Sequence, residues 1–358
     1  MAIIADWLDK YAGAERCVKS FIKVFNTADI YSLVDFLSPE EKKLIVGNKN
    51  IITSFLQNIP FAKKHFRKML FLFPYAIESF DLRKYDVILS SSHSVAKNVL
   101  TTSEQIHVCY CHTPMRYAWD MYFDYMEKLN GLEKMLFKLL MHKIRIWDFA
   151  SVGRVDYFIA NSNFVKRRIK KIYSRDAAVI YPPVDINLFD FEKTKENYFV
   201  TVSRLVGYKR VDLLVKAFNR LGEKLIIIGE GEEKEKLMKM AGDNIIFKGY
   251  VSHKEKVNIL KRAKAFVYAA KEDFGIAPVE AQVCGTPVIA LNKGGTAESV
   301  IDGVSGILFN EQNEENIIKA VNDFNKRTFD YFAIREHSMK FDVNKFEEKI
   351  KSFLESII

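Results

Sequence analysis

The sequence has few cysteines and no long apolar run. Its 358 residues include four cysteines, too few for a disulfide framework in a chain of this length, so a reducing cytoplasm is the expected compartment. The longest apolar stretch, MLFLFPYAI, has nine residues and contains a proline, whereas a membrane-spanning helix needs about 20 residues. The opening residues, MAIIADWLDKYAGAER, lack the basic flank and long apolar region of a signal peptide. We therefore expect neither a disulfide-stabilised secreted domain nor an integral membrane protein.

Internal repeats and low-complexity tracts are also missing. Apolar residues make up 49% of the chain and the mean hydropathy is −0.08, which is typical of a globular protein and not of a disordered one. A length of 358 residues favours two domains. Short apolar runs alternate with amphipathic stretches, a pattern that predicts parallel α/β sheets. The expected strands are 1–5, 86–90, 107–111, 157–160, 198–202, 224–228, 245–248, 265–268 and 287–290.

A pair of prolines predicts the domain boundary. Pro182 and Pro183 cannot continue a helix or a central strand, because both lack an N–H group. A polar and charged stretch follows them, so we place the linker at about 182–197. The expected domains are 1–182, joined by a C-terminal amphipathic helix at about 343–358, and 183–342.

The formal charge of +9 is confined to the first half of the chain. Residues 1–182 hold 27 Lys+Arg against 18 Asp+Glu, whereas residues 183–358 hold 27 of each. An anionic partner is therefore expected to face the first half. Two basic stretches with apolar and aromatic residues, 58–77 and 163–173, are typical of segments that lie on an anionic membrane surface. The alternative is a solvated helix face with a core-facing apolar side; nucleic acid is not expected, because no recognised nucleic-acid-binding module is present.

Cations and glycines follow the expected strands of the second half, at the sheet edge where ligands bind. Arg204 and Lys209 come after strand 198–202, and two cations in that place suit a diphosphate; two solvated surface charges are the alternative. Gly229 follows strand 224–228 and would let a ligand approach the backbone. The glycine signal is unspecific, since many strand-to-helix turns use this residue.

The stretch EDFGIAPVEAQVCGTPVIA places two carboxylates around a glycine-proline break. Gly275 can adopt backbone angles that are closed to other residues, and Pro278 suits the first turn of a helix. The N–H groups of 275–277 are then expected to form an anion site at the helix N-terminus. Glu272 and Glu280 can face one cavity and accept hydrogen bonds from sugar hydroxyls. The alternative is a solvated loop acid and an acid that favours the first turn of its helix.

Five motifs of the second half resemble the retaining family-four glycosyltransferases of the GT-B architecture. They are SRLVGYKR, GEGEEKEKL, KGYV, KEDFGIAPVEAQVCGTPVIA and GGTAESVIDGVSGILF, and the two glutamates separated by seven residues are the most specific part. The resemblance implies an α/β fold of two Rossmann-like domains facing across a cleft, an acceptor-binding first domain and a donor-binding second domain. No Asp-x-Asp follows a strand, so neither a metal nor a cofactor is expected.

The resemblance also implies roles for individual residues. Arg204 and Lys209 would hold the diphosphate of a nucleotide-sugar donor, Glu272 the donor sugar and Glu280 the ribose. No residue is a candidate covalent nucleophile, and the departing phosphate would help to deprotonate the acceptor. Other donor contacts would be made mainly by the backbone of Phe274, Gly275 and Ile276 at the sugar and phosphate, and of Gly249, Tyr250 and Val251 at the base.

Two stretches of the first half also resemble this family. YAGAERCVKSF resembles its glycine loop, but only one of the usual two glycines is present, so only Gly13 is carried over. HVCYCHTPMRYAWD is most similar to bacterial O-antigen mannosyltransferases and implies that His112 contacts the donor sugar; a strand-end histidine satisfied locally is the alternative.

Two further groups in the first half have weaker interpretations. His107, Cys109, Cys111 and His112 cluster in sequence, but zinc sites space their cysteines differently and recruit a second cluster, so a metal site is not expected. The segment 91–94, SSHS, could contact the acceptor, although we favour capping of the following turn.

The expected function is a retaining, metal-independent hexosyltransferase. It would move mannose from GDP-mannose to a polyprenyl-diphosphate-linked or oligosaccharide acceptor during surface polysaccharide assembly, such as that of lipopolysaccharide. The same fold with a UDP-sugar donor is one alternative, and a catalytically silent binding partner in a glycan-assembly complex is another. The expected location is the cytoplasm, peripheral on the inner face of the cytoplasmic membrane.

Overall fold

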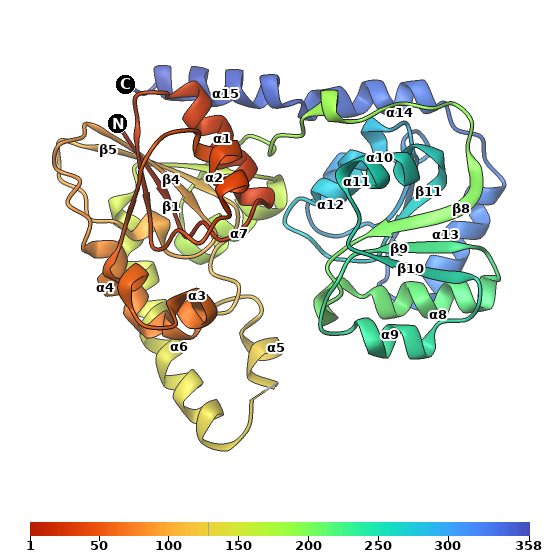
Figure 1. Ribbon diagram of the computed structural model, residues 1–358, viewed down its shortest axis with the longest axis horizontal. Helices are drawn as coiled ribbons and strands as arrows, with labels where there is room; N and C mark the ends of the chain where they lie inside the picture. The colour runs from red at the N-terminus through yellow and green to blue at the C-terminus, as the bar shows by residue number, and fades with distance from the viewer. Residues whose placement is uncertain (128) are drawn as a thin grey trace. The chain divides into compact units, whose positions relative to one another are not determined.

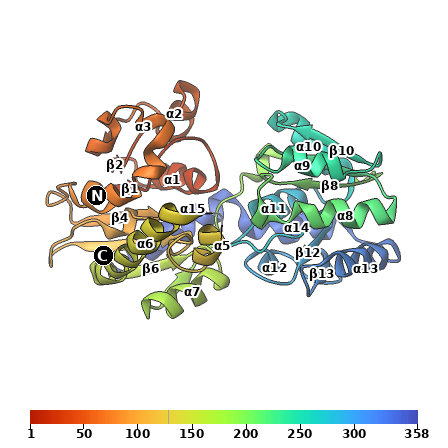
Figure 2. The ribbon, with the colours of Figure 1, turned by 90° about the horizontal axis from the view of Figure 1, so that it is seen from below.

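The computed structural model describes residues 1–127 and 129–358 and divides into two compact units. Unit 1 consists of 1–182 with 346–358, and unit 2 of 183–345. Each unit is built on one parallel β-sheet, as the alternation of apolar runs with amphipathic stretches predicts. Helices cover both faces of each sheet (Figure 1 and Figure 2). Most strand residues are therefore buried.

The elements of unit 1 alternate along the chain between strands and helices. The strands are β1 (Ala2–Ala5), β2 (Asp29–Ser32), β3 (Ile51–Thr53), β4 (Val87–Ser92), β5 (Ile106–Cys111), β6 (Tyr157–Ala160) and β7 (Ala177–Val179). The helices are α1 (Gly13–Val24), α2 (Pro39–Val46), α3 (Ala62–His65), α4 (Phe73–Glu78), α5 (Tyr122–Glu127), α6 (Gly131–Ser151), α7 (Asn163–Tyr173) and α15 (Val343–Glu355).

Unit 2 repeats the alternation. Its strands are β8 (Glu196–Val202), β9 (Leu225–Ile228), β10 (Ile245–Gly249), β11 (Ala263–Tyr268), β12 (Val288–Leu291) and β13 (Gly306–Phe309). Its helices are α8 (Val211–Leu221), α9 (Lys234–Met240), α10 (His253–Arg262), α11 (Ile276–Val283), α12 (Thr296–Ser299), α13 (Glu314–Asn325) and α14 (Tyr331–Ser338). Short 3₁₀ helices in the chain are 55–58, 66–72, 96–98, 152–154, 186–188, 207–209 and 339–341.

Both sheets are doubly wound. The strand order is β3-β2-β1-β4-β5-β6-β7 in unit 1 and β10-β9-β8-β11-β12-β13 in unit 2. The order reverses between β1 and β4 in the first sheet and between β8 and β11 in the second. Ligands of such sheets bind outside the carboxyl ends of the strands at this switch point. The topology therefore predicts that ligand contacts come from the residues that follow β1, β4, β8 and β11.

Alternation along the strands divides the core of unit 1 between two faces. Ile3 and Ala5 of β1 pack in the core with α1, α2 and α15, whereas Ala2 and Ile4 pack in the core with α4 and α6. The apolar face predicted for the C-terminal helix is present: Phe346 packs on Phe21 and Tyr110, with ring centroids 5.7 and 5.6 Å apart.

All nine expected strands are present, with ends that shift by one or two residues. Four strands were not predicted: β2, β3, β7 and β13. They are short, and β3 and β7 are the edge strands of the first sheet, where half-exposed positions weaken the apolar signal. No helix of the described residues is long and apolar enough to span a bilayer.

His107 lies in the middle layer of unit 1 as a neutral, fully buried imidazole. Its Nε2 lies 2.8 Å from the hydroxyl oxygen of Ser90, and its Nδ1 lies 3.0 Å from the carbonyl oxygen of Arg154. Both ring nitrogens are satisfied in the neutral form, with Nδ1–H as donor and Nε2 as acceptor. Burial lowers the pKa of His107 to about 4.

We expect acid to destabilise unit 1 through this histidine. Below about pH 6.5 the unfolded chain takes up a proton on His107, which the folded chain accepts only near pH 4. Stability therefore falls as the pH drops through this window, by up to about 3 kcal/mol from this group. Urea unfolding can be followed by tryptophan fluorescence, because all three tryptophans lie in unit 1. His107→Gln should unfold with a shallower pH dependence than the wild type between pH 6.5 and 4; equal slopes would contradict the assignment.

Candidate functional site

Two strands at the switch point of unit 2 bring Lys209 and Glu272 into an ion pair. Lys209 lies just after β8, and Glu272 just after β11, the neighbouring strand. The ammonium of Lys209 contacts Oε1 of Glu272. The hydroxyl of Tyr268 lies 3.2 Å from Lys209 Nζ and 3.2 Å from Glu272 Oε1. The two charged side chains are only 14% and 12% exposed, so they form a compact polar cluster at the edge where such sheets bind ligands.

The electrostatics of this cluster keep Lys209 charged. Burial lowers the pKa of Lys209, but Tyr268 and Glu272 raise it by more, so the pKa of Lys209 stands above its ordinary value. Burial, with the nearby Glu272 carboxylate, raises the pKa of Tyr268. The cluster therefore presents an ammonium, a neutral phenol and a carboxylate at neutral pH.

Tyr208 connects the two cations predicted to hold a diphosphate. The guanidinium of Arg204 donates a hydrogen bond to the Tyr208 hydroxyl at 3.0 Å. The Tyr208 ring centroid lies 6.0 Å from Arg204 Cζ and 5.3 Å from Lys209 Nζ, within the range of cation–π attraction. Neither Tyr208 nor Tyr268 was predicted as a site residue; the position of Tyr208 between the two cations in SRLVGYKR is the signal that could have identified it.

Glycines after β12 support the backbone around Glu272. The N–H of Gly295 donates to the carbonyl oxygen of Glu272 at 2.7 Å. A Cβ atom on Gly294 would lie 2.5 Å from that same oxygen, and a Cβ on Gly295 would lie 2.0 Å from the carbonyl oxygen of Asp273. No side chain fits at such distances, so the GGT motif allows the loops after β11 and β12 to touch.

Gly275 shapes the start of α11. Gly275 caps the helix with φ of 88°, and a Cβ there would lie 2.5 Å from Oγ1 of Thr296. That hydroxyl is buried and makes no hydrogen bond with any described residue. Phe274 is 3% exposed and faces Phe341 with ring centroids 5.4 Å apart. Its side chain therefore belongs to the core, and only its backbone, with that of Gly275 and Ile276, can meet a ligand here.

Glu280 lies deeper than its sequence position suggests. We expected Glu280 in the first turn of the helix that follows Gly275; this is wrong, because α11 begins at Ile276 and Glu280 is its fifth residue. The carboxylate is 3% exposed, and its Oε2 accepts a hydrogen bond from Lys256 Nζ at 2.8 Å. Lys256 comes from α10, and the sequence analysis did not single it out.

The residues expected around the base lie at the same edge of the sheet. Gly229 follows β9, and its N–H donates to the carbonyl oxygen of Gly249 at 2.9 Å. A Cβ on Gly229 would lie 1.9 Å from the carbonyl oxygen of Ser203, so close packing alone already requires a glycine. Tyr250 is 89% exposed and Val251 is half-buried; neither side chain forms part of the cluster around Lys209.

A second polar cluster lies at the switch point of unit 1. Asp6 follows β1 and is buried; its Oδ2 lies 2.8 Å from Nδ1 of His93, which follows β4. His112 follows β5, and its Nε2 lies 2.9 Å from the hydroxyl oxygen of Ser91. The rings of His93 and His112 are 6.3 Å apart. The structure thus adds Asp6, which was not predicted, to His93 of the SSHS segment and the predicted His112.

Asp6 also performs the capping that the sequence analysis assigned to the SSHS segment. Its carboxylate accepts backbone N–H bonds from four consecutive residues, 93–96, at 2.5–3.0 Å. Burial raises the pKa of Asp6, but His93 and these bonds lower it by more, so its pKa is lowered. Burial lowers the pKa of His93, and Asp6 raises it by more, so its pKa is raised. An imidazolium beside a carboxylate is therefore favoured at this site.

Gly13 is the first residue of α1. The N–H groups just before it are already used: Tyr11 donates to Glu41 Oε1 at 2.9 Å and Ala12 donates to Glu15 Oε2 at 3.0 Å. Among the described residues no group of three or more His, Cys, Asp or Glu is placed to hold a metal ion.

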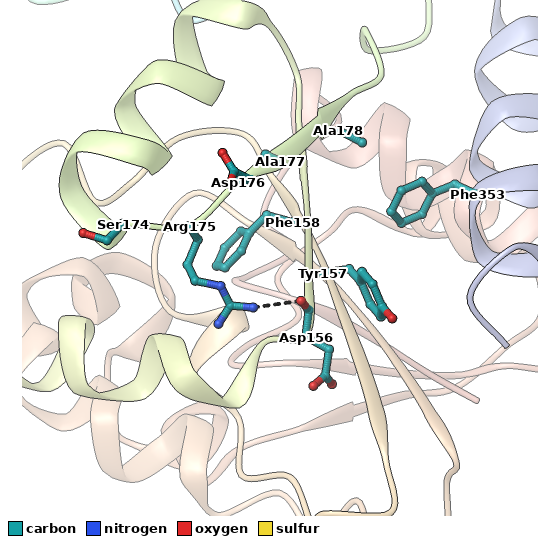
Figure 3. A pocket seen from close by; sticks show the side chains of 9 residues that line it. All are labelled: Asp156, Tyr157, Phe158, Ser174, Arg175, Asp176, Ala177, Ala178 and Phe353. Atoms are coloured by element: carbon teal, nitrogen blue, oxygen red, sulfur yellow. Dashed lines mark hydrogen bonds between the residues drawn. The ribbon is translucent and has the colours of Figure 1, made fainter.

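One pocket lies at the β6–β7 edge of unit 1, and none of the predicted site residues lines it (Figure 3). It measures about 430 Å³. Arg175 donates a hydrogen bond to the carbonyl oxygen of Asp156 at 2.8 Å on its floor. The lining residues are Asp156, Tyr157, Phe158, Ser174, Arg175, Asp176, Ala177, Ala178 and Phe353, and they contribute nothing to either polar cluster.

Two family models match adjoining parts of the chain. The model described as "Glycosyltransferase Family 4" matches residues 11–188, and the model described as "Glycosyl transferases group 1" matches residues 186–354. The chain belongs to the group 1 and family 4 glycosyltransferases. The two matched regions correspond broadly to the two Rossmann-like units, and the two clusters described above are the candidate sites of the chain.

Curated relatives of this glycosyltransferase are distant. An uncharacterized glycosyltransferase of Methanocaldococcus jannaschii is 30% identical over 47% of this chain and 49% of its own length. The alpha-1,3/1,6-mannosyltransferase ALG2 of Dictyostelium discoideum is 25% identical over 64% of this chain and 65% of its own. ALG2 of Homo sapiens is 26% identical over 76% and 70%. The chain thus spans half to two thirds of the length of several curated relatives that it matches.

Solved structures match the whole chain and show the GT-B fold. Anabaena HepE, solved in complex with UDP and glucose, has a TM-score of 0.72 and 18% identity, covering 99% of both chains. The lipopolysaccharide outer core galactosyltransferase WaaB has a TM-score of 0.68 and 17% identity, covering 100% of this chain and 99% of its own.

Proposed function

We propose that this protein is a retaining hexosyltransferase that uses a nucleotide-sugar donor, with mannose from GDP-mannose as the transferred group. The observation that carries the proposal is the ion pair of Lys209 and Glu272 at the switch point of the second sheet. A nucleotide sugar is complementary to it, because the diphosphate requires a cation and the sugar hydroxyls require an acceptor. The ALG2 relatives, alpha-1,3/1,6-mannosyltransferases at 25–27% identity, support mannose.

Donor binding would divide this ion pair. Diphosphate oxygens would take the Lys209 ammonium, with Arg204 adding a second cation, and Glu272 would then accept hydrogen bonds from sugar hydroxyls. The Thr296 hydroxyl, buried without a described partner, is a further donor beside Gly275. These charges would be in place before the reaction begins, which is how electrostatic preorganisation lowers a barrier.

The transfer step would proceed on one face of the sugar. The bond between the anomeric carbon and the diphosphate oxygen breaks, and a bond to the acceptor oxygen forms on the same face. The acceptor proton passes to the departing diphosphate oxygen, so no protein nucleophile is required. Arg204 and Lys209 would stabilise the leaving diphosphate, and we propose that no metal takes part. His112, beside Ser91, would contact the donor sugar.

The proposed acceptor is a lipid-linked sugar or an oligosaccharide in the assembly of a surface polysaccharide. The basic first half, with 27 Lys+Arg against 18 Asp+Glu in residues 1–182, supports an anionic partner such as a polyprenyl diphosphate in an anionic membrane. We accordingly propose a peripheral association with the inner face of the cytoplasmic membrane.

A UDP-sugar donor is the second candidate. HepE was solved with UDP and with UDP-glucose, and the residues expected around the base offer this chain mainly backbone contacts, which discriminate weakly between bases. A catalytically silent partner is disfavoured, because the Lys209–Glu272 pair is present in the structure.

A thermal-shift panel of GDP, UDP and ADP tests the donor. We expect GDP to raise the unfolding temperature most, because GDP-mannose is the proposed donor. A ligand that binds only the folded state stabilises that state by about 2.7 kcal/mol when its concentration is 100 times its Kd. A larger shift with UDP would replace mannose by the second candidate. No shift with any nucleoside diphosphate would overturn the proposed donor site.

A further inference from the structure

Helix α6 has two apolar faces, and only one of them is covered by the protein. Its inner face, which includes Met141 and Ile144, belongs to the core that α6 shares with α4 and the sheet. The opposite face carries large apolar side chains that are between 52% and 65% exposed. These are Leu132, Met135, Leu136, Leu139, Ile146 and Phe149, and we refer to them as the α6 stripe.

The α6 stripe lies on one side of the helix, in two parts. Leu132, Met135, Leu136 and Leu139 form the first part and Ile146 and Phe149 the second, each with the three- or four-residue spacing that places side chains on one side of a helix. The exposed His142 and Lys143 lie between the two parts. The helix has 21 residues, which corresponds to a length of about 30 Å. Figure 1 shows the N-terminal half of α6 running beyond the sheet of its unit, with α5 beside it. Phe123 of α5 adds a further apolar side chain that is 66% exposed.

The charged residues on α6 itself are mostly cations. Lys138 and Lys143 are exposed and Lys134 is half-buried, whereas Glu133 is the exposed acid of this helix. The neighbouring α5 adds two exposed acids, Asp124 and Glu127. The other acid of α6, Asp148, is buried and paired with Lys97. An apolar stripe edged by lysines is the pattern of a helix that lies in the interface of an anionic membrane.

The two basic stretches predicted to lie on an anionic membrane surface, 58–77 and 163–173, are less suited to that role than α6. In 58–77, Phe66 and Phe73 are each 2% exposed and form part of the core, although Phe61 and Phe71 remain exposed. In 163–173, Val165 and Ile169 are fully buried. Both stretches are therefore largely amphipathic elements that pack on their own sheet, and α6 is the helix with an uncovered apolar face.

We propose that the α6 stripe is the surface by which this protein docks on a bilayer containing anionic lipid, with α6 parallel to the membrane plane. The inference deepens the membrane association proposed above and rests on it, but not on the donor site. Charge complementarity favours a lipid surface over a second copy of the chain, because pairing two stripes would bring Lys138 and Lys143 of one copy near those of the other. Anionic headgroups neutralise them instead.

Vesicle flotation tests this surface without any sugar transfer. The wild-type chain should float with vesicles of phosphatidylcholine and phosphatidylglycerol, and less with phosphatidylcholine alone. Leu136→Glu/Leu139→Glu should weaken partitioning by at least about a hundredfold, since it removes two apolar side chains and adds two anions. Met238→Glu, on an equally exposed apolar residue of α9 in unit 2, is the matched control and should float like the wild type.

A fluorescent label gives a second measurement that does not depend on the charge-reversed variant. All four native cysteines are buried, so a cysteine introduced as Leu136→Cys can be labelled selectively with a polarity-sensitive dye. Its emission should shift to the blue when anionic vesicles are added, whereas the same dye on Met238→Cys should not respond. The proposal would be overturned if the wild-type chain did not float with anionic vesicles, or if the emission of the label on Leu136→Cys did not shift. It would also be overturned if the wild type were a dimer and the double variant a monomer, because the α6 stripe would then pair two copies of the chain. A GDP thermal shift unchanged in the double variant would show that the donor site is independent of this outcome.

Discussion

Lys209→Met is expected to reduce sugar transfer by two to three orders of magnitude. The substitution keeps most of the side-chain volume but removes the ammonium that contacts Glu272 and lies 3.2 Å from the Tyr268 hydroxyl. Loss of one preorganised charge at a leaving group costs about 10²–10³ in kcat. Loss of a charge-assisted bond should also weaken binding of the nucleoside diphosphate by about tenfold to a hundredfold. Product formation and isothermal titration with GDP measure the two effects separately.

Glu272→Gln should separate the two halves of the ion pair. It removes the acceptor for sugar hydroxyls but leaves Lys209 available to phosphate, so GDP should bind at least as tightly as to the wild type while transfer falls. If both variants lost GDP binding equally, the division of roles between phosphate and sugar would be wrong.

Lys264→Met is the matched control for these variants. Lys264 is a partly buried lysine near an acid, Glu223, at 3.8 Å, but it lies near the start of β11, at the opposite edge of the same sheet. Its loss should change neither GDP binding nor transfer. A similar loss in this control would mean that Lys209→Met acts through stability and not through the donor site.

Lys97→Met is expected to lower the free energy of unfolding of unit 1 by about 3–5 kcal/mol. The Lys97 ammonium contacts Asp148, and both residues are at most 1% exposed. Asp148 also accepts hydrogen bonds from Trp119 Nε1 and the Tyr173 hydroxyl, each at 2.8 Å. Removing Lys97 leaves a buried carboxylate without its cation, and the desolvation cost of that charge is no longer offset.

Urea unfolding followed by tryptophan fluorescence measures this effect, because the tryptophans report on unit 1 alone. Lys97→Met/Asp148→Asn should lose less stability than the sum of the two single variants, since both remove the same interaction. Lys23→Met removes an ion pair whose lysine is 61% exposed and should unfold almost like the wild type. Strict additivity in the double variant would contradict a coupled buried pair.

The positions of Lys209 and Glu272 at the sheet edge could be predicted, because each residue comes shortly after a strand. Lys209 follows the expected strand 198–202, and Glu272 follows 265–268; parallel strands deliver such residues to one edge. Their direct pairing was not predictable from spacing, because it depends on β8 and β11 being neighbours. The capping of residues 93–96 was also missed, since it comes from Asp6, which is 87 positions away from His93.

The surface that we propose for membrane docking could not be predicted from local sequence. Segment 58–77 carries the stronger basic and aromatic signal, yet its phenylalanines Phe66 and Phe73 are in the core. The α6 stripe was not singled out, because a helix that is apolar on two sides has no clear amphipathic pattern.

The sequence by itself determined two parallel α/β units, nine of their strands and the chemistry available at the strand ends, because apolar periodicity and glycine-proline breaks are local properties of the chain. The tertiary structure decided which of those groups meet. Strand order pairs Lys209 with Glu272 and Asp6 with His93. Helix packing places Lys256 on Glu280 and leaves one face of α6 exposed. Contacts between residues far apart in the chain follow from sheet topology and helix packing, which no short stretch of sequence contains.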